Sequence, residues 1–434
     1  MEDSPPAARP AGYRLRFRRS TYGEGVTTPS HSARGPSALG GLMWIAVWGF
    51  SGFFLSYSTM VPISLDRGLT AVTGGTLLTI MMLSVIAVQP AAPALRQRWG
   101  PRRTIGSSLL LMAGGHGASL VIPHPVAALL VAGVAVGCGF GVLVVVATAA
   151  VPAVSRPDRA GRALGQFGAA TSAAAAVGAP LGLWFSGVVP LEVFRLMAAT
   201  CVLLAFVALR GVPDRAAEVS GTGTVEPLEP LEATVEGEAH QGGAARASGT
   251  GSGPAAGRWW AALGPVLLPF LVSMAAYGLV IAFGPGGDTA HPAVFIATMQ
   301  AASVAGRWIS GSLTDRLDHT AVYTAGIVMT AASLVAVVLV HSPWLLAACL
   351  VLMGVGIGTV QSASLVMAFA RAASHGRASV GWNMSFDTGL GLAGLFGGVG
   401  FTYLGTEPTF AGVAGLILLA GIPLWLRRSR SAGR

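Results

Sequence analysis

One acidic residue stands inside a long apolar run of this sequence. Asp387 lies between Asn383 and Gly391, and residues four apart share one face of a helix. The run predicts a helix over 378–403, in which Asp387 lies about 13 Å from the start and so near the middle of a bilayer. A charge there is costly unless it is paired, hydrated or protonated, so Asp387 is a candidate to carry a proton or to contact a solute. The alternative is a structural hydrogen bond to a neighbouring helix.

A few other polar residues interrupt apolar runs. Arg307 could pair with Asp387 if their helices were neighbours, but extension of its side chain to the cytoplasmic surface is favoured. His116 is more typical of a packing residue than of a titrating one. Further candidates to contact a solute are Gln300, Gln361, Tyr57 and Tyr277. For these side chains, hydrogen bonding between helices is an equally good interpretation.

Several other chemistries are excluded. All cations are arginine, so the lysine of a phosphate-binding loop cannot be present. Energy must then come from an ion or solute gradient, unless the protein is a passive uniporter, and we expect a proton or other ion gradient. The cysteines Cys138, Cys201 and Cys349 lie in apolar runs without metal-ligand spacing. No catalytic set of Ser, His and Asp stands out, so we expect no enzyme activity, no metal and no cofactor.

The composition predicts where these residues are held. The chain has 434 residues, of which 53% are hydrophobic and 10% charged, and its mean hydropathy is +0.66. Thr104–Ser155 and His319–Ala370 contain no charged residue, and each can hold two membrane helices of about 20 residues. The same pattern predicts twelve helices: 40–63, 70–92, 104–122, 125–154, 163–186, 190–212, 259–284, 290–313, 320–341, 343–370, 378–403 and 409–426.

The arginines indicate the orientation of these helices. They gather before the first helix, in every even-numbered loop and in the tail, for example at Arg96, Arg156 and Arg427. Because cytoplasmic loops carry an excess of positive charge, both termini and the central loop are predicted to be cytoplasmic.

The chain also repeats itself at about half its length. Gly137, Gly139 and Gly141 are matched by the triplet Gly354, Gly356 and Gly358, and the two charge-free stretches match in the same order. The fold class is therefore an all-α polytopic membrane protein, with twelve transmembrane helices in two six-helix pseudo-repeats. The predicted parts are an Arg-rich cytoplasmic tail (1–39), a first half (40–212), a disordered cytoplasmic loop (213–257), a second half (258–427) and a cytoplasmic tail (428–434).

Together with these helices, the loop motifs resemble the major facilitator superfamily (MFS) of secondary transporters. The family carries a Gly-x-x-x-Asp-Arg type motif after the second helix and a weaker copy after the eighth. The matching positions are Arg98, Gly100 and Arg102 in the first loop and Gly311, Asp315 and Arg316 in the second. Gln97 replaces the Asp of the first loop. The resemblance implies that these residues gate the cytoplasmic loops.

A second motif resembles drug–proton antiporters of bacteria. Gly178, Pro180 and Gly182 look like part of their Gly/Pro helix-packing motif. The resemblance implies proton-coupled efflux of a drug-like or natural-product compound by alternating access, with a small-molecule substrate and the lipid bilayer as partners. Uptake of a sugar or metabolite and a non-transporting receptor or sensor are the alternatives. We further expect a monomer in the bacterial inner membrane, with no nucleic-acid partner.

Overall fold

The apolar runs of the sequence fold as helices, the structure in which a segment satisfies its own backbone polar groups in lipid. The computed structural model describes residues 36–155, 160–212, 255–284, 291–314, 316–371 and 375–432. The elements are α1 (Pro36–Asp66), α2 (Ala71–Val88), η1 (Gln89–Ala91), α3 (Ala92–Trp99), α4 (Pro101–Val121), α5 (Pro125–Val154), α6 (Ala160–Val188), α7 (Leu191–Leu204), η3 (Ala205–Gly211), α8 (Ala255–Phe283), α9 (Pro292–Thr314), α10 (His319–Leu339), α11 (Pro343–Arg371), α12 (His375–Tyr403) and α13 (Thr406–Ala432).

Proline occupies the first position of several of these helices. Pro125 and Pro343 begin α5 and α11, where the missing N–H of proline costs nothing, so the predicted helix starts at 125 and 343 are confirmed. The sequence predicts a loop directly after residue 92, and this prediction is wrong for the residues up to Trp99. Pro90 and Pro93 lie in the first turns of η1 and α3, so the chain stays helical from Ala71 to Trp99.

The helices form twelve segments at the places that the sequence predicts, with α2, η1 and α3 making one segment and α7 and η3 another. Nine of the helices within the described ranges are long and apolar enough to cross a membrane by length and composition. The segments α4, α9 and α12 are not among these nine.

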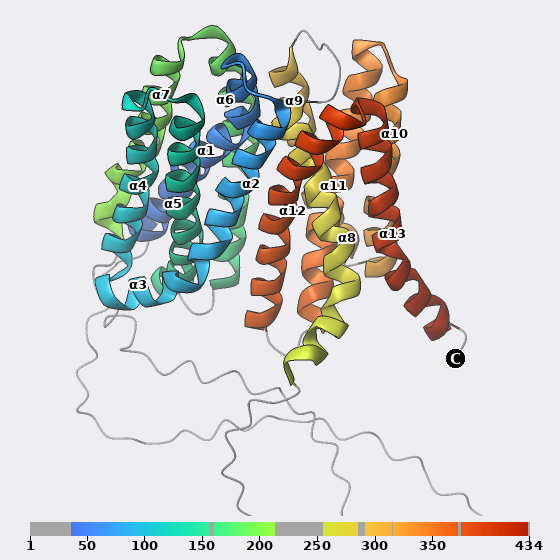
Figure 1. Cartoon of the computed structure of the whole chain (residues 1–434). Coiled ribbons are helices and arrows are strands. Elements are labelled where there is room, and N and C mark those ends of the chain that lie inside the picture. Colours follow the sequence, from blue (N-terminus) through green and yellow to red (C-terminus); the bar gives the residue numbers. More distant parts are fainter. Residues whose placement is uncertain are drawn as a thin grey trace, which may run out of the picture. The chain divides into compact units, whose positions relative to one another are not determined.

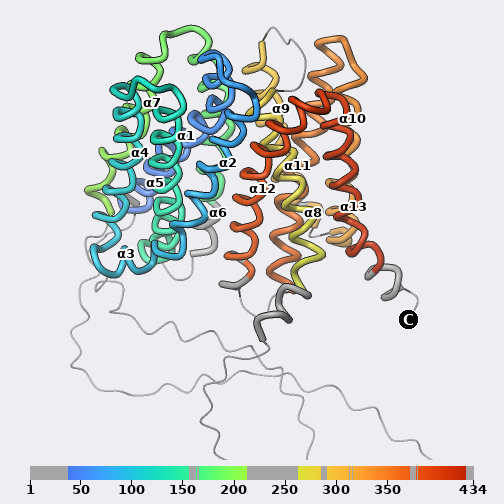
Figure 2. Tube along the Cα trace, viewed as in Figure 1, coloured from blue at the N-terminus to red at the C-terminus, as the bar shows by residue number. Residues whose placement is uncertain are grey.

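The segments separate into a group of α1–α7 and a group of α8–α13, which lie next to each other in Figures 1 and 2. All described residues belong to one compact unit, Gly35–Arg434. Contacts between the two groups come mainly from α2 with α12 and from α6 with α9, with α1 also packing on α8. These pairs therefore position any residue that acts between the groups.

The repeated glycines occupy equivalent places in the two groups. Gly137 and Gly141 of α5 face α2, and Gly354 and Gly358 of α11 face α9. A Cβ on any of them would meet a backbone carbonyl of the facing helix. Small residues therefore permit the same close approach of two helices in each group, as the pseudo-repeat predicts.

Gly358→Ala is expected to lower the thermal stability of the purified protein. The added Cβ would lie 2.6 Å from the backbone nitrogen of Arg307, so α9 and α11 would have to separate, at a cost of about 1–3 kcal/mol. Gly412→Ala on α13 is the control, because nothing lies within 4 Å of the corresponding Cβ. Equal melting temperatures for the two variants in detergent would contradict this packing.

Parts of the predicted domain organisation fall outside the described residues. They are residues 1–35, 213–254, 433 and 434. The first helix begins at Pro36 and α8 begins at Ala255, a few residues before the predicted starts of the two halves. The proposed cytoplasmic roles of the tails and the central loop stay predictions.

Candidate functional site between the helix groups

Asp387 lies in the middle of α12, at its contact with the α2 segment. Its side chain is 7% exposed, and its Oδ2 accepts a hydrogen bond of 2.7 Å from Nε2 of Gln89. Gln89 begins η1, directly after α2. The carboxyl group is thus held by a residue from the other helix group, and this contact can change when the groups move.

Two further polar contacts reach α12 from the first helix group. Tyr57 of α1 donates to the carbonyl of Leu390 at 2.8 Å, and Thr79 of α2 donates to the carbonyl of Gly391 at 2.9 Å. Beyond them, Gly75 and Gly394 bring the backbones of α2 and α12 together. We call this line of contacts from Gln89–Asp387 to Gly75–Gly394 the α2–α12 seam.

Aromatic side chains flank Asp387 on α12. Trp382 and Phe386 are partly buried, and Trp382 stacks on Phe270 of α8 with ring centroids 4.8 Å apart. Asn383, one turn before Asp387, is exposed. This part of α12 therefore combines an acid, an amide and aromatic surface, which suits an amphipathic ligand.

A second cluster joins α8, α9 and α6. Tyr277 donates to Oε1 of Gln300 at 2.6 Å, and Nε2 of Gln300 donates to the carbonyl of Ala175 at 3.0 Å. The side chains of Tyr277 and Gln300 are 4% and 2% exposed, so both are buried in this conformation. Their hydrogen bonds position α6 against α9.

Arg307 extends the α6–α9 contact. Its Nη1 donates to Oγ of Ser172 on α6 at 2.6 Å, and the extension of this side chain to the cytoplasmic surface stays a prediction. Ser172 is within reach of Arg307 because α6 packs on α9. In the described part of the chain, no ion pair joins Arg307 to Asp387, because the two residues belong to different contacts between the groups.

Two candidate residues contact neighbours within their own helix group. Gln361 of α11 is buried, and its Nε2 donates to Sδ of Met274 on α8 at 3.4 Å. His116 of α4 is fully buried between Ser56 and Arg195. The packing interpretation of His116 agrees with this position.

The residues of the Gly/Pro motif in α6 lie against α1. Gly178 faces Ser51 and Gly182 faces Leu55, and in both cases a Cβ would meet the backbone of α1. Pro180, between them, is buried inside α6. The motif lies within the first helix group, at the contact between α1 and α6.

The loop motif occupies the ends of α3, α4 and α9. Gly100 ends α3 and begins α4 with a φ of +80°, a conformation that favours glycine. Arg98 and Arg316 are exposed, Gly311 has open space at its Cβ position, and Asp315 lies outside the described residues. The gating role of these residues and of Arg102 stays a prediction.

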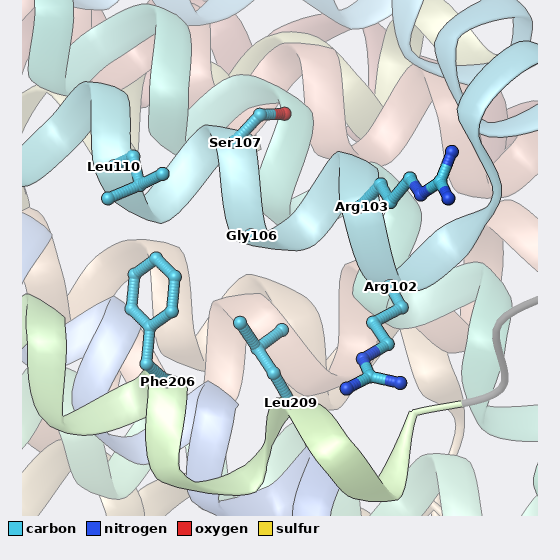
Figure 3. A pocket seen from close by; sticks show the side chains of 7 residues that line it. All are labelled: Arg102, Arg103, Gly106, Ser107, Leu110, Phe206 and Leu209. Carbon is cyan, nitrogen blue, oxygen red and sulfur yellow. The ribbon is translucent and has the colours of Figure 1, made fainter.

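Arg102 also lines a groove of about 520 Å³ between α4 and η3 (Figure 3). The remaining lining residues are Arg103, Gly106, Ser107, Leu110, Phe206 and Leu209. All of them belong to the first helix group, so the groove is separate from the contacts between groups.

The sequence did not single out Gln89, Thr79 or Ser172. Gln89 offered one local signal, because an uncharged amide directly precedes Pro90 within an apolar run. Thr79 and Ser172 offered none, since small hydroxyl residues are common in membrane helices.

Comparison with protein families finds the model of the Major Facilitator Superfamily, which matches residues 39–319 and 267–434. A curated relative, the chloramphenicol resistance protein of Streptomyces lividans, is 32% identical over 187 residues. That match spans 41% of this chain and 45% of the relative's length, so less than half of each protein is compared.

Solved structures share the fold over most of the chain. A peptide transporter POT in complex with sulfate is 16% identical with a TM-score of 0.70, and the match covers 91% of this chain and 95% of that one. A bacterial homologue of the human lysosomal transporter Spinster, inward-facing and unoccupied, is 13% identical with a TM-score of 0.67, covering 90% and 96%. At these identities the likeness concerns the fold alone.

Proposed function

Because this chain belongs to the Major Facilitator Superfamily and is therefore a secondary transporter, we propose that it exports a small drug-like or natural-product compound in exchange for protons. Membership makes it a multi-pass membrane protein with a small-molecule substrate and not an enzyme, as the sequence predicts. Outward direction, proton coupling, a monomeric state and cytoplasmic termini belong to the proposal.

The hydrogen bond between Gln89 and Asp387 carries the proposal of proton coupling. Of the acids in the described part of the chain, Asp387 is the one with a buried side chain. An ionised carboxylate accepts a stronger hydrogen bond than a protonated one. Proton binding therefore weakens a contact between the two helix groups, and proton release restores it. The same proton that moves down its gradient would thus bias the opening of the α2–α12 seam.

The surroundings of Asp387 support an uncharged, amphipathic substrate. Trp382 and Phe386 supply partly exposed aromatic faces, and Asn383 supplies an amide. A strongly anionic solute would need a fixed positive charge at this place, and Arg307 is bound to Ser172 at the other contact. Chloramphenicol, a neutral aromatic compound, is the first substrate to test because the relative is a chloramphenicol resistance protein.

Everted membrane vesicles from bacteria that express the chain are expected to accumulate labelled chloramphenicol when their interior is acidified. Accumulation should stop when a protonophore collapses the pH gradient, and vesicles without the protein provide the background. Uptake of chloramphenicol by right-side-out vesicles under an inward proton gradient would contradict export. Absence of flux in both vesicle types, tested with a panel of neutral aromatic antibiotics, would contradict the drug-like substrate.

A further inference from the structure

A small cavity lies at one end of the first helix group, away from the contacts between groups. Its volume is about 180 Å³. The residues that line it are Arg67, Ser119, Leu120, Ile122, Pro123, Pro125, Ala128, Leu129, Leu191, Glu192 and Arg195. They come from the ends of α1, α4, α5 and α7 that face away from the expected cytoplasmic side.

Arg195 gives this cavity a buried positive charge. Its side chain is 4% exposed, and within the described ranges no carboxylate lies within 4.0 Å of its guanidinium group. A buried guanidinium without a counter-charge is costly. The cavity is where a compensating negative group can reach it.

His116 does not supply that compensation. Nη1 of Arg195 lies 3.4 Å from Nδ1 of His116, and Nε2 of the same ring lies 3.1 Å from Oγ of Ser56. Arginine can only donate, so Nδ1 accepts and the ring is neutral. The imidazole thus orients Arg195 but leaves its charge intact.

The remaining charges of the cavity leave one positive charge in excess. Arg67 and Glu192 lie 3.9 Å apart and largely offset each other, and their side chains are 42% and 68% exposed. The cavity also meets the first turn of α7, which has no side-chain cap, so its backbone N–H groups and the helix dipole favour an anion there.

We propose that this cavity binds one small, singly charged anionic group against Arg195. Chloride and a short carboxylate fit the volume as free ions, and the phosphate of an anionic lipid headgroup offers the same chemistry from the membrane. The group would complete the charge balance of the first helix group and stabilise the packing of α7 on α4. This site is independent of Asp387 and of the transported solute.

Chloride and acetate are each titrated into the purified protein in neutral detergent, at constant ionic strength with a bulky organic sulfonate as the replacement anion. The melting temperature is expected to rise in a saturable way. If it rises only in nanodiscs that contain phosphatidylglycerol, and not in phosphatidylcholine nanodiscs, the group is a lipid headgroup. No saturable effect of chloride, acetate or phosphatidylglycerol would overturn the proposal.

Two variants with opposite expected effects test the position. Arg195→Gln keeps a donor for His116 but removes the charge, so the apparent affinity should fall by at least about tenfold. Glu192→Gln removes a competing carboxylate and should raise the affinity about threefold. Arg210→Gln, an exposed arginine in η3 outside the lining, is the control and should leave the affinity unchanged. If Arg195→Gln does not fold, Glu192→Gln still tests the site. An anion affinity in Glu192→Gln that is equal to or lower than that of the unmodified protein refutes the proposal.

Discussion

Asp387→Asn is expected to abolish transport driven by a proton gradient and to leave the protein folded and inserted. The amide oxygen of Asn can still accept the hydrogen bond from Gln89, so the α2–α12 seam keeps its geometry. An amide cannot bind and release a proton, so the contact becomes insensitive to the gradient. The expected loss is at least about a hundredfold in gradient-driven flux, the scale of removing an essential acid–base group.

Exchange of substrate in the absence of a proton gradient distinguishes a loss of proton coupling from a loss of folding. Vesicles that contain Asp387→Asn and are loaded with unlabelled chloramphenicol should still exchange it for labelled compound. Glu407→Gln, which changes an exposed acid in the first turn of α13, is the control and should transport normally. Unchanged gradient-driven flux in Asp387→Asn would refute the coupling role of Asp387.

The fold was readable from the sequence because lipid imposes a strict rule on charge. Charged residues are rare in the bilayer core, so the charge-free stretches such as Thr104–Ser155 marked helix pairs directly. The segment after residue 92 was misread because its charges, from Arg96 onward, suggested a loop although α3 continues there.

The site was only partly readable, because it depends on contacts between the two helix groups. The free-energy cost of burying an acid identified Asp387 as a candidate, but it did not indicate which residue Asp387 contacts. Its donor Gln89 lies 298 residues away along the chain, and the Ser172 partner of Arg307 lies 135 residues away. No local pattern reports which helices of the two groups meet, so neither Gln89 nor Ser172 could be named as a partner in advance.

Gly394→Val is expected to stop transport by a different route, through the conformational balance of the two helix groups. Gly75 and Gly394 lie backbone to backbone, and a Cβ on Gly394 would lie 3.0 Å from the nitrogen of Thr79. A valine there forces α2 and α12 apart. Because this contact lies between the groups, the strain of about 1–3 kcal/mol is relieved by their separation rather than by unfolding.

A shift of about 2 kcal/mol changes the ratio of two conformations by about thirtyfold, so turnover that requires both conformations should fall by at least about tenfold. The separation is measured with a cysteine at Thr79, after Cys138, Cys201 and Cys349 are replaced by Ser. Because the hydroxyl of Thr79 contacts Gly391 in the closed seam, the cysteine should react faster with a maleimide in the Gly394→Val variant. Gly415→Val, with open space at its Cβ position, is the control.

The melting temperature distinguishes this effect from a packing defect. Gly358→Ala strains a contact within one helix group and should lower the melting temperature, whereas Gly394→Val strains a contact between groups and should change it much less. If Gly394→Val transported normally, or if the cysteine at Thr79 reacted at the unmodified rate, α2 and α12 would not need this close approach. The α2–α12 seam would then be a passive contact, and the proton on Asp387 would have to act on some other pair of helices.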